Sequence, residues 1–375
     1  MTPRELRADV PGLQEGAYLN FGAHGPSPEY VVDAVSDAVA DHEFGSGTND
    51  PYETAFAGYD RARERVAAFI GADPAEVALT ESTTDGINRI ANAIDFEPGD
   101  VVVRTDLEHP AGVLPWQQRE REGVEVRVVE TDNGRVDIDA YTEAVADATL
   151  VCFSAVTWTH GTQLPVQKLV DIAHDAGAFT LVDAVQVPGQ LPMAVEEWGA
   201  DAVVAAGHKW LLGPWGSGFL YVDRAVAETL TPGSVGYRSV SDPTADELTY
   251  KPGAKRFEIG TTSPGPHAGL IEAIDAIESV GVGTIADRIA NLTNRLKAGV
   301  DEEALLSPQS YESGLVSIAV NDPEAVVERA ADEGIVIRSL PHPDVIRVSV
   351  HAVSTAAEID SLLELLETAE SPSPP

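Results

Sequence analysis

Lysine is scarce in this sequence, and one lysine stands in an unusual setting. Of the 24 basic residues in the 375-residue chain, five are lysines, at positions 168, 209, 251, 255 and 297. Lys209 lies between the apolar run DAVVAA (201–206) and the Gly- and Trp-containing segment WLLGPWGSG (210–218). A lysine removed from water is rare, and its lowered pKa suits it to Schiff-base chemistry. We therefore interpret Lys209 as a candidate imine-forming amine, the alternative being an ordinary surface lysine.

Asp183 ends another apolar run and is followed closely by Gln186. The run reads FTLVD (179–183), and the next segment is AVQVPGQ (184–190). A carboxylate with an apolar strand behind it must find a partner or change its pKa. Capping of the next turn is the open alternative. Because open α/β sheets bind ligands beyond the carboxyl ends of their strands, both residues are candidates for the edge where Lys209 lies.

Three hydroxyl residues stand where a helix is expected to begin. Ser82, Thr83 and Thr84 follow the apolar run VALT (77–80). Free backbone N–H groups, the helix dipole and the hydroxyls together suit a phosphate group. Plain helix capping by these residues is the alternative interpretation.

His109 follows a further apolar run, DVVVRT (100–105), in the segment DLEHPAGVLPWQ (106–117). Taken alone, it reads first as a solvent-exposed loop histidine. Taken together, the residues supply a phosphate site, an acid that can pair with a ring nitrogen, an aromatic ring that can stack, and an amine that can form an imine. Pyridoxal phosphate requires this set of groups, so the sequence predicts a site for that cofactor.

The elements that position these residues alternate between strand and helix. Apolar runs predict strands at 77–80, 100–105, 124–130, 149–156, 179–183, 201–207 and 218–223, and amphipathic spacing predicts helices at 28–43, 52–72, from about 84, and 166–177. This pattern is typical of a mostly parallel sheet covered by helices on both faces. Residues 226–265, rich in Pro, Gly, Thr and Ser, read as long loops.

A second, smaller α/β unit is expected toward the C-terminus. Helices are predicted at 267–281, 285–300 and 354–369, and strands at 314–320, 334–339 and 345–350. The predicted division is a large cofactor-binding domain over 16–259, a small domain from 1–15 and 260–370, and a disordered tail over 371–375.

The charge balance argues against several kinds of partner. With 61 acidic residues against 24 basic ones, the net charge is −37, while 43% of residues are hydrophobic. Broad nucleic-acid binding and attraction to anionic membranes are disfavoured because both need Lys and Arg. An acid excess with scarce lysine and a normal core fits a salt-adapted, halophilic protein, a specific basic partner being the alternative.

A single cysteine, Cys152, excludes an internal disulfide framework. The first residues, MTPRELRADVPG, contain no apolar signal segment, no run of 18 apolar residues occurs, and the nine histidines show no metal-ligand spacing. We therefore expect a cytoplasmic protein without a metal site.

At these motifs the sequence resembles the fold-type I pyridoxal-phosphate enzymes of the class V aminotransferase and cysteine desulfurase family. The resemblance runs from NFGAHGPSP (20–28) to RVSVHAVSTAAEIDSLLELL (347–366). Its most specific pieces are STTDGIN (82–88), LEHPAGVLPWQ (107–117), LVDAVQ (181–186), AAGHKWLLGPWGSGFLYV (205–222) and RFEIGTTSP (256–264). Five motifs in this order and spacing make the resemblance strong.

The resemblance implies a role for each matching residue. Lys209 would form the internal aldimine, Asp183 would pair with the pyridine nitrogen, and His109 would stack on the ring. The remaining cofactor contacts implied are Gln186 on the ring hydroxyl, Thr83, Thr84 and His208 on the phosphate, and Thr261 on the phosphate of the partner subunit in a homodimer. On the substrate side the implied residues are Arg347 at the α-carboxylate, with Arg338, Trp158, Asn20 and His24.

Three departures from the family pattern matter. Cysteine desulfurases place a catalytic Cys on a loop between the positions of Arg338 and Arg347, but SLPHPDVI (339–346) contains none. Many relatives have Ser where this chain has Ala206, so one phosphate contact is missing. Trp158 stands where desulfurases have Asn, which is more similar to the cysteine/cystine C–S lyases and isopenicillin-N-epimerase-like members.

The expected activity is therefore β-elimination on a cysteine- or cystine-like amino acid. Transamination and epimerisation share the first step, in which Lys209 removes the α-proton, and both remain open. A non-catalytic cofactor-binding or assembly protein is the alternative from another class. A nucleotide-binding protein is disfavoured because neither a P-loop motif nor a strand-linked G-x-G-x-x-G is present.

Overall fold

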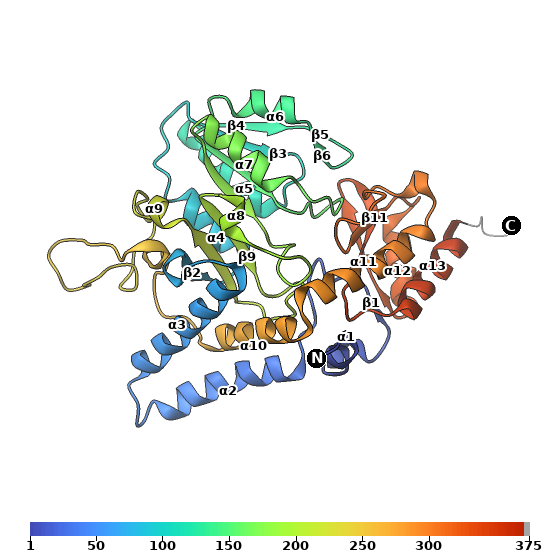
Figure 1. Ribbon diagram of the computed structural model, residues 1–375, viewed down its shortest axis with the longest axis horizontal. Coiled ribbons are helices and arrows are strands. Elements are labelled where there is room, and N and C mark those ends of the chain that lie inside the picture. The colour runs from blue at the N-terminus through green and yellow to red at the C-terminus, as the bar shows by residue number, and fades with distance from the viewer. Residues whose placement is uncertain (371–375) are drawn as a thin grey trace.

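A seven-stranded sheet forms the centre of the larger part of the molecule in the computed structural model, which describes residues 1–370 (Figure 1). The strand order is β2 (Val77–Thr80), β10 (Gly218–Val222), β9 (Ala202–Ala206), β8 (Phe179–Asp183), β7 (Leu150–Ser154), β3 (Val101–Thr105) and β4 (Glu125–Val129). Only β10 runs antiparallel to its neighbours. The prediction of a mostly parallel sheet is confirmed, and each predicted strand is present.

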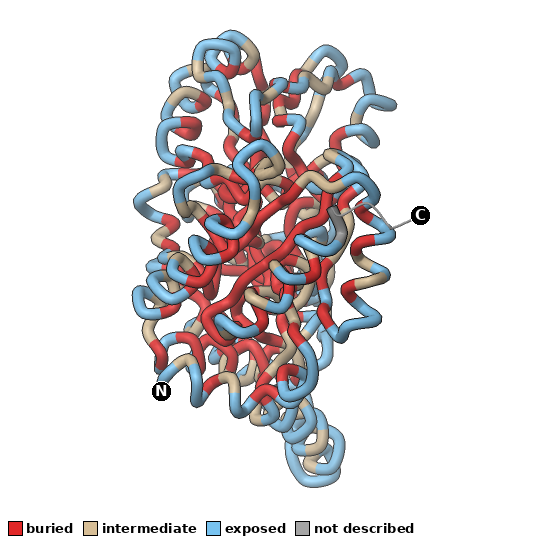
Figure 2. Tube along the Cα trace, turned by 90° about the vertical axis from the view of Figure 1, so that its right-hand side faces the viewer, coloured by how far each residue is buried: buried red, intermediate tan, exposed pale blue. Residues whose placement is uncertain are grey.

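Helices cover both faces of this sheet, as its nearly continuous apolar strands predict. Successive strand residues point to opposite faces, so Val203 joins one apolar cluster and Val204 the other. The first cluster includes α3 (Pro51–Ile70), α6 (Ile138–Val145) and α7 (Val166–Asp175). The second includes α4 (Thr83–Ala91) and α5 (Leu114–Arg119). Figure 2 shows the buried strands passing through the middle of the molecule.

A three-stranded antiparallel sheet forms the smaller unit, coloured orange to red in Figure 1. Its order is β11 (Leu315–Ile318), β14 (Asp344–Ser349) and β13 (Arg338–Pro341). Helices α11 (Val282–Ala298), α12 (Pro323–Asp332) and α13 (Ala356–Glu370) pack on it through a separate apolar cluster. The short strands β1 (Ala17–Tyr18) and β12 (Ile335–Val336) pair in parallel beside it, so the start of the chain joins this unit.

The remaining elements are short or connect the two units. They are α1 (Pro3–Ala8), α2 (Glu29–Gly45), β5 (Thr131–Asp132), β6 (Arg135–Val136), α8 (Val195–Trp198), α9 (Arg224–Ala227) and α10 (Gly265–Val280), with 3₁₀ turns at Pro11–Leu13, Pro74–Glu76, Pro110–Gly112, Glu120–Glu122, Gly253–Phe257 and Glu302–Ala304. The segment 228–264 is irregular apart from one of these turns and an isolated bridge, as its composition predicts.

The contacts at the two predicted domain borders differ. Arg7 forms an ion pair of 2.8 Å with Glu358 of α13, which ties residues 1–15 to the smaller unit. Helix α10, in contrast, packs against α2 and α3 of the larger part. The division at 259/260 remains a prediction, and the tail 371–375 lies outside the described residues. No helix among residues 1–370 is long and apolar enough to cross a bilayer.

Candidate active site

A cavity of about 200 Å³ lies at the carboxyl ends of the parallel strands, between the large sheet and the strands β13 and β14. Ten residues predicted from the sequence line it together: Thr83, Thr84, His109, Trp158, Asp183, Gln186, His208, Lys209, Arg338 and Arg347. Ser82, which the sequence places with Thr83 and Thr84 at a candidate phosphate site, lines it too, whereas Gly22, Ala23, Ala111 and Val185 were not assigned to this cavity. The sheet edge therefore gathers side chains that are up to 325 positions apart in the chain (347 − 22).

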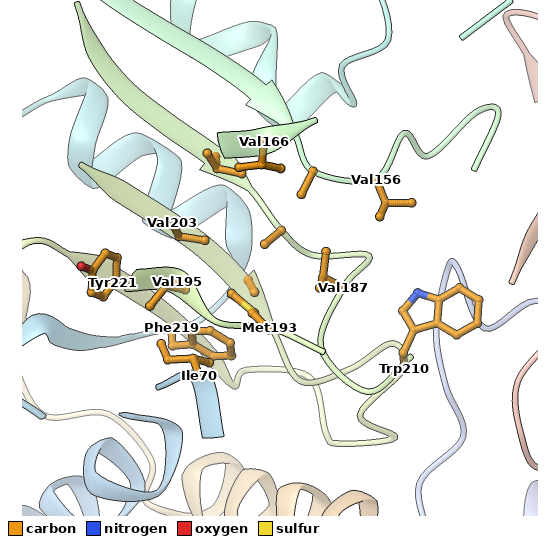
Figure 3. Close-up of a cluster of buried hydrophobic side chains, with 14 of the residues drawn as sticks. Ile70, Val156, Val166, Val187, Met193, Val195, Val203, Trp210, Phe219 and Tyr221 are labelled. Atoms are coloured by element: carbon orange, nitrogen blue, oxygen red, sulfur yellow. The ribbon is translucent and has the colours of Figure 1, made fainter. Parts of the chain in front are cut away.

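Lys209 is held in place by the residue that follows it. The Trp210 side chain is fully buried and belongs to the apolar cluster drawn in Figure 3. Its Nε1 donates a 2.7 Å hydrogen bond to Gln186 Oε1, and its ring stacks on that of His351. Because a packed and hydrogen-bonded indole has little rotational freedom, it fixes the backbone from which the Lys209 amine projects.

Asp183 and Lys209 have shifted pKa values of the kind found at active sites. Burial lowers the pKa of the Lys209 amine to about 8, against the attraction of Asp183 and with the repulsion of Arg347 and Arg338. Burial raises the pKa of Asp183, while the Val185 N–H bond of 2.9 Å and the charge of Lys209 act in the opposite direction. The pair therefore supplies an amine that loses its proton readily and a carboxylate whose ionised form is stabilised by a cationic partner.

The N-terminus of α4 supplies the donors of an anion site. Ser82 is the N-cap, and its Oγ accepts from the N–H of Asp85 at 3.1 Å. The Thr83 hydroxyl is buried and has no hydrogen-bond partner among the described residues. Gly86 lets this helix approach the sheet, because a Cβ there would lie 2.7 Å from Val204 Cγ1. A helix N-terminus with an unsatisfied hydroxyl suits a phosphate.

His208 lines the same cavity as the N-terminus of α4. Burial, followed by the charge of Lys209, lowers the pKa of its ring to about 4, so the ring is neutral at physiological pH. Its carbonyl accepts a 2.8 Å hydrogen bond from Gly25 N–H, which brings the segment 20–25 over the pocket.

His109 presents a neutral ring to the pocket. Its Nδ1 accepts from Ala111 N–H at 3.2 Å, which leaves the proton on Nε2, and burial lowers its pKa to about 4. The ring meets that of Trp158 edge to face, with centroids 5.2 Å apart at 83°. Both rings are thereby oriented before any ligand binds.

Arg347 is a buried cation without an ion-pair partner among residues 1–368. Its side chain is 1% exposed, and its Nη1 donates to Trp158 O at 3.0 Å. Its Nε and Nη2 atoms have no partner, although a buried charge normally does. Arg338 faces it across the β13–β14 pair in register, and among the described residues its side chain makes one hydrogen bond, a weak one of 3.4 Å to Ser339 O. Two such guanidinium groups favour a carboxylate ligand.

Gln186 lines the pocket with its amide already engaged. Its Nε2 donates to Gly22 O at 3.0 Å, and its Oε1 accepts from Trp210. One amide N–H remains for the ring contact that the resemblance implies. Gly22 gives no signal in the sequence, because its importance depends on the folded chain: a Cβ at this position would lie 2.5 Å from Leu315 Cδ2 and 3.2 Å from Arg347 Nη2.

Three predicted residues do not line this cavity. Asn20 pairs with Ser349 in an isolated bridge, and His24 packs parallel to the His208 ring and against the edge of Trp215. Thr261 lines a separate groove of about 430 Å³ beside α2 and α3. Because Thr261 is expected to serve the partner subunit, its place in one chain leaves that role a prediction. No group of three His, Cys, Asp or Glu able to hold a metal occurs within the described part of the chain.

Comparisons with known proteins identify the family of this chain. A sequence model of the aminotransferase class-V family matches residues 17–362. A protein named probable cysteine desulfurase from Methanothermobacter thermautotrophicus is 33% identical over 98% of both chains. The structure of an apo cysteine desulfurase from Thermococcus onnurineus superposes with a TM-score of 0.90 at 28% identity, covering 98% of each chain.

The cystine C–S lyase C-DES is also similar in structure. Its complex with the product cysteine persulfide gives a TM-score of 0.88 at 26% identity, over 95% of this chain and 98% of that one. Another structure of C-DES has glycine covalently linked to its PLP cofactor, with a TM-score of 0.89 at 26% identity over 96% and 98% of the two chains. With the family match covering more than nine tenths of the sequence, the chain belongs to the aminotransferase class-V family.

Proposed function

We propose that this protein is a pyridoxal-phosphate-dependent C–S lyase that acts by β-elimination on a cysteine- or cystine-like amino acid. The observation that carries the proposal is the meeting of Lys209 and Asp183 in one pocket with the N-terminus of α4. A protein that only bound the cofactor would need neither a low-pKa amine nor a buried acid.

The residues present fit pyridoxal phosphate. The unpartnered Thr83 hydroxyl, Thr84, the α4 backbone and His208 would hold its phosphate, and Lys209 its aldehyde carbon. Asp183 would hold the proton of the pyridine nitrogen, and His109 would lie against the ring. When bound, this cofactor withdraws electrons from Cα of an attached amino acid.

Three side chains of this protein then have separate roles toward the substrate. Arg347 binds the α-carboxylate through its free Nε and Nη2 atoms and fixes which Cα bond faces the ring. Neutral Lys209 takes the α-proton as general base, which its lowered pKa permits near neutral pH. Asp183, as the anionic partner in the pocket, would hold the proton on the ring nitrogen of a bound cofactor.

The position of the single cysteine favours a lyase that forms no persulfide on the protein. The hairpin joining β13 and β14 has no Cys, and Cys152, the one thiol of the chain, lies fully buried in β7. Burial raises the pKa of that thiol well above its ordinary value, which opposes thiolate formation. Relatives named cysteine desulfurase and the cystine C–S lyase share this fold, and the missing thiol favours the second activity.

A homodimer with sites at the subunit interface is part of the proposal. Large apolar side chains are exposed around the groove that contains Thr261, among them Phe44 (86% exposed) and Tyr52 (56% exposed). An exposed apolar surface of this kind suits burial against a second copy. Mixing Lys209→Ala and Thr261→Ala chains after dissociation should restore activity if Thr261 serves the partner's site, and no restoration would contradict this arrangement.

The reaction is tested by incubating the protein with pyridoxal phosphate and a panel of amino acids in high salt. Release of pyruvate with a sulfur product from cysteine or cystine supports the lyase. Keto acid without sulfur release indicates a transaminase, inversion alone indicates an epimerase, and no turnover indicates a binding protein. Cys152→Ala should retain full activity, whereas a persulfide-forming desulfurase that uses this thiol would lose it.

We further propose a cytoplasmic location, in keeping with the single unpaired cysteine.

A further inference from the structure

A buried carboxylate outside the cavity lining lies directly before His109. Glu108 is 6% exposed and contacts both β3 and β7 at their carboxyl ends. Its Oε1 accepts from Thr105 Oγ1 at 2.6 Å and from Ser154 N–H at 3.2 Å, and its Oε2 accepts from Ser154 Oγ at 2.6 Å. The proposed reaction assigns no task to this group.

The neighbours of Glu108 connect it to the site. Ser154 lies in register with Asp183 on the adjacent strand, and Ala155 N–H donates to Asp183 O at 2.8 Å. Thr105 Oγ1 also accepts from Leu107 N–H at 3.2 Å, so the chain just before Glu108 is held as well. We call the hydrogen bonds of Glu108 to Thr105 and Ser154 the Glu108 bracket. His109 comes next, and its own anchors are the Ala111 N–H bond to Nδ1, the Gly112 N–H bond to its carbonyl at 2.7 Å and the edge-to-face contact with Trp158.

From this geometry we infer that Glu108 is the positioning residue of His109, fixing the ring's height above the sheet by bracing β3 against β7. The inference rests on the proposed function, because it concerns the face of the pocket that would receive the pyridine ring. A loop held only by its own turn would let the imidazole move. Three hydrogen bonds to two strands remove that freedom.

Glutamine is a suitable conservative replacement at position 108. Burial, opposed by the Ser154 and Thr105 hydroxyl bonds and aided by the charge of Asp183, raises the pKa of Glu108 to about 7. The neutral form is therefore well populated at physiological pH. The glutamine oxygen can accept from Thr105 and Ser154 N–H, while the Ser154 hydroxyl turns to accept from the new amide. Alanine removes the whole bracket.

The test is a double-mutant cycle read by pyridoxal-phosphate affinity, measured by fluorescence quenching of the full chain. Glu108→Ala should weaken binding about 10-fold, and Glu108→Gln should stay within about 3-fold of the original. In the His109→Ala background, Glu108→Ala should add less than about 2-fold, because both changes remove the same contact. Independent, multiplying effects in that background would overturn the inference.

Three further variants distinguish a positioning effect from a general loss of stability. Thr180→Val removes a buried hydroxyl bond to Asp201 near the other end of β8, so it should lower stability without changing the circular dichroism of the bound cofactor. Glu108→Ala should change that signal, and an unchanged signal would count against positioning. If Glu108→Ala does not fold, Thr105→Val and Ser154→Ala remove parts of the bracket and should each give an intermediate loss of affinity. Wild-type protein that binds no pyridoxal phosphate would refute the proposed function itself.

Discussion

Asp183 is the last residue of β8, and Lys209 lies three residues beyond β9, so two adjacent parallel strands deliver an acid and an amine to one pocket. The backbone of each is anchored, Asp183 by the sheet and Lys209 by the buried Trp210. Their positions follow from strand order and core packing, which makes the catalytic pair a property of the fold.

Replacing Lys209 by alanine should abolish both the yellow absorbance of the bound cofactor and turnover. The loss of the general base alone costs about 10²- to 10⁴-fold in rate. Lys168→Ala, which changes an exposed lysine of α7, is the matched control and should leave both unchanged. A Lys209→Ala protein that keeps the yellow band would contradict the assignment.

Asp183→Asn should lower the activity while raising the stability of the cofactor-free protein. Turnover should fall by roughly 10²-fold or more, because the ring nitrogen loses its anionic partner. Asparagine keeps an oxygen for the Val185 N–H bond and removes a buried charge, so the free energy of unfolding of the cofactor-free protein should rise by roughly 1 kcal/mol. Thermal melts with and without the cofactor measure this, and Asp171→Asn on the exposed face of α7 is the control. A cofactor-free protein that melts lower would refute the charge argument.

The rate of α-proton exchange should rise with pH and level off above about 8, where the Lys209 amine is neutral. Burial lowers the pKa of this amine, and the positive charges of Arg347 and Arg338 lower it further. Removing one positive charge stabilises the ammonium form, so Arg338→Gln should shift the ascending limb to higher pH. The limb is measured by exchange of the α-proton with deuterated solvent, with exposed Arg121→Gln as the control. A shift to lower pH would show that another group titrates.

Gly22→Ala should weaken substrate binding with little effect on the fold elsewhere. The added Cβ would lie 2.5 Å from Leu315 Cδ2 and 3.2 Å from Arg347 Nη2, which forces the guanidinium from its position. KM should rise about 10-fold, with a smaller change in kcat. Leu315→Val removes the crowding methyl group, so the double variant should recover part of the loss. Lack of any recovery would place the cause outside this contact.

Salt should stabilise the protein through screening of its own charge. At a net charge of −37, self-repulsion disfavours the compact state at low ionic strength. The melting temperature should rise steadily between about 0.1 M and about 2 M KCl, where the screening length falls from roughly 10 Å to below roughly 3 Å. Changing three exposed acids of α6 and α7 (Glu143, Asp171 and Asp175) to their amides should reduce the slope. A melting temperature independent of salt would refute halophilic adaptation.

The strands and the long helices could be predicted because their apolar periodicity is local in the sequence. The pocket could be predicted as far as each residue ends an apolar strand or opens a helix, as Asp183 and Thr83 do. Gly22 was not predicted as a lining residue because its importance lies in an absent side chain, which shows only when Leu315 and Arg347 are brought beside it. Glu108 was not predicted as a positioning residue for a similar reason, since its partner Ser154 is 46 positions away. Helix α12 was also not predicted, because its apolar face is short and is defined by packing on the small sheet.

The pocket draws on positions from Gly22 near the beginning of the chain to Arg347 near its end. While the protein is being synthesised, the amine, the acid and the phosphate-binding helix emerge long before the arginine that receives the substrate. The amine and this arginine are 138 positions apart (347 − 209 = 138) and belong to the larger and the smaller unit. The group that reacts and the group that selects the substrate are therefore supplied by different units of the fold.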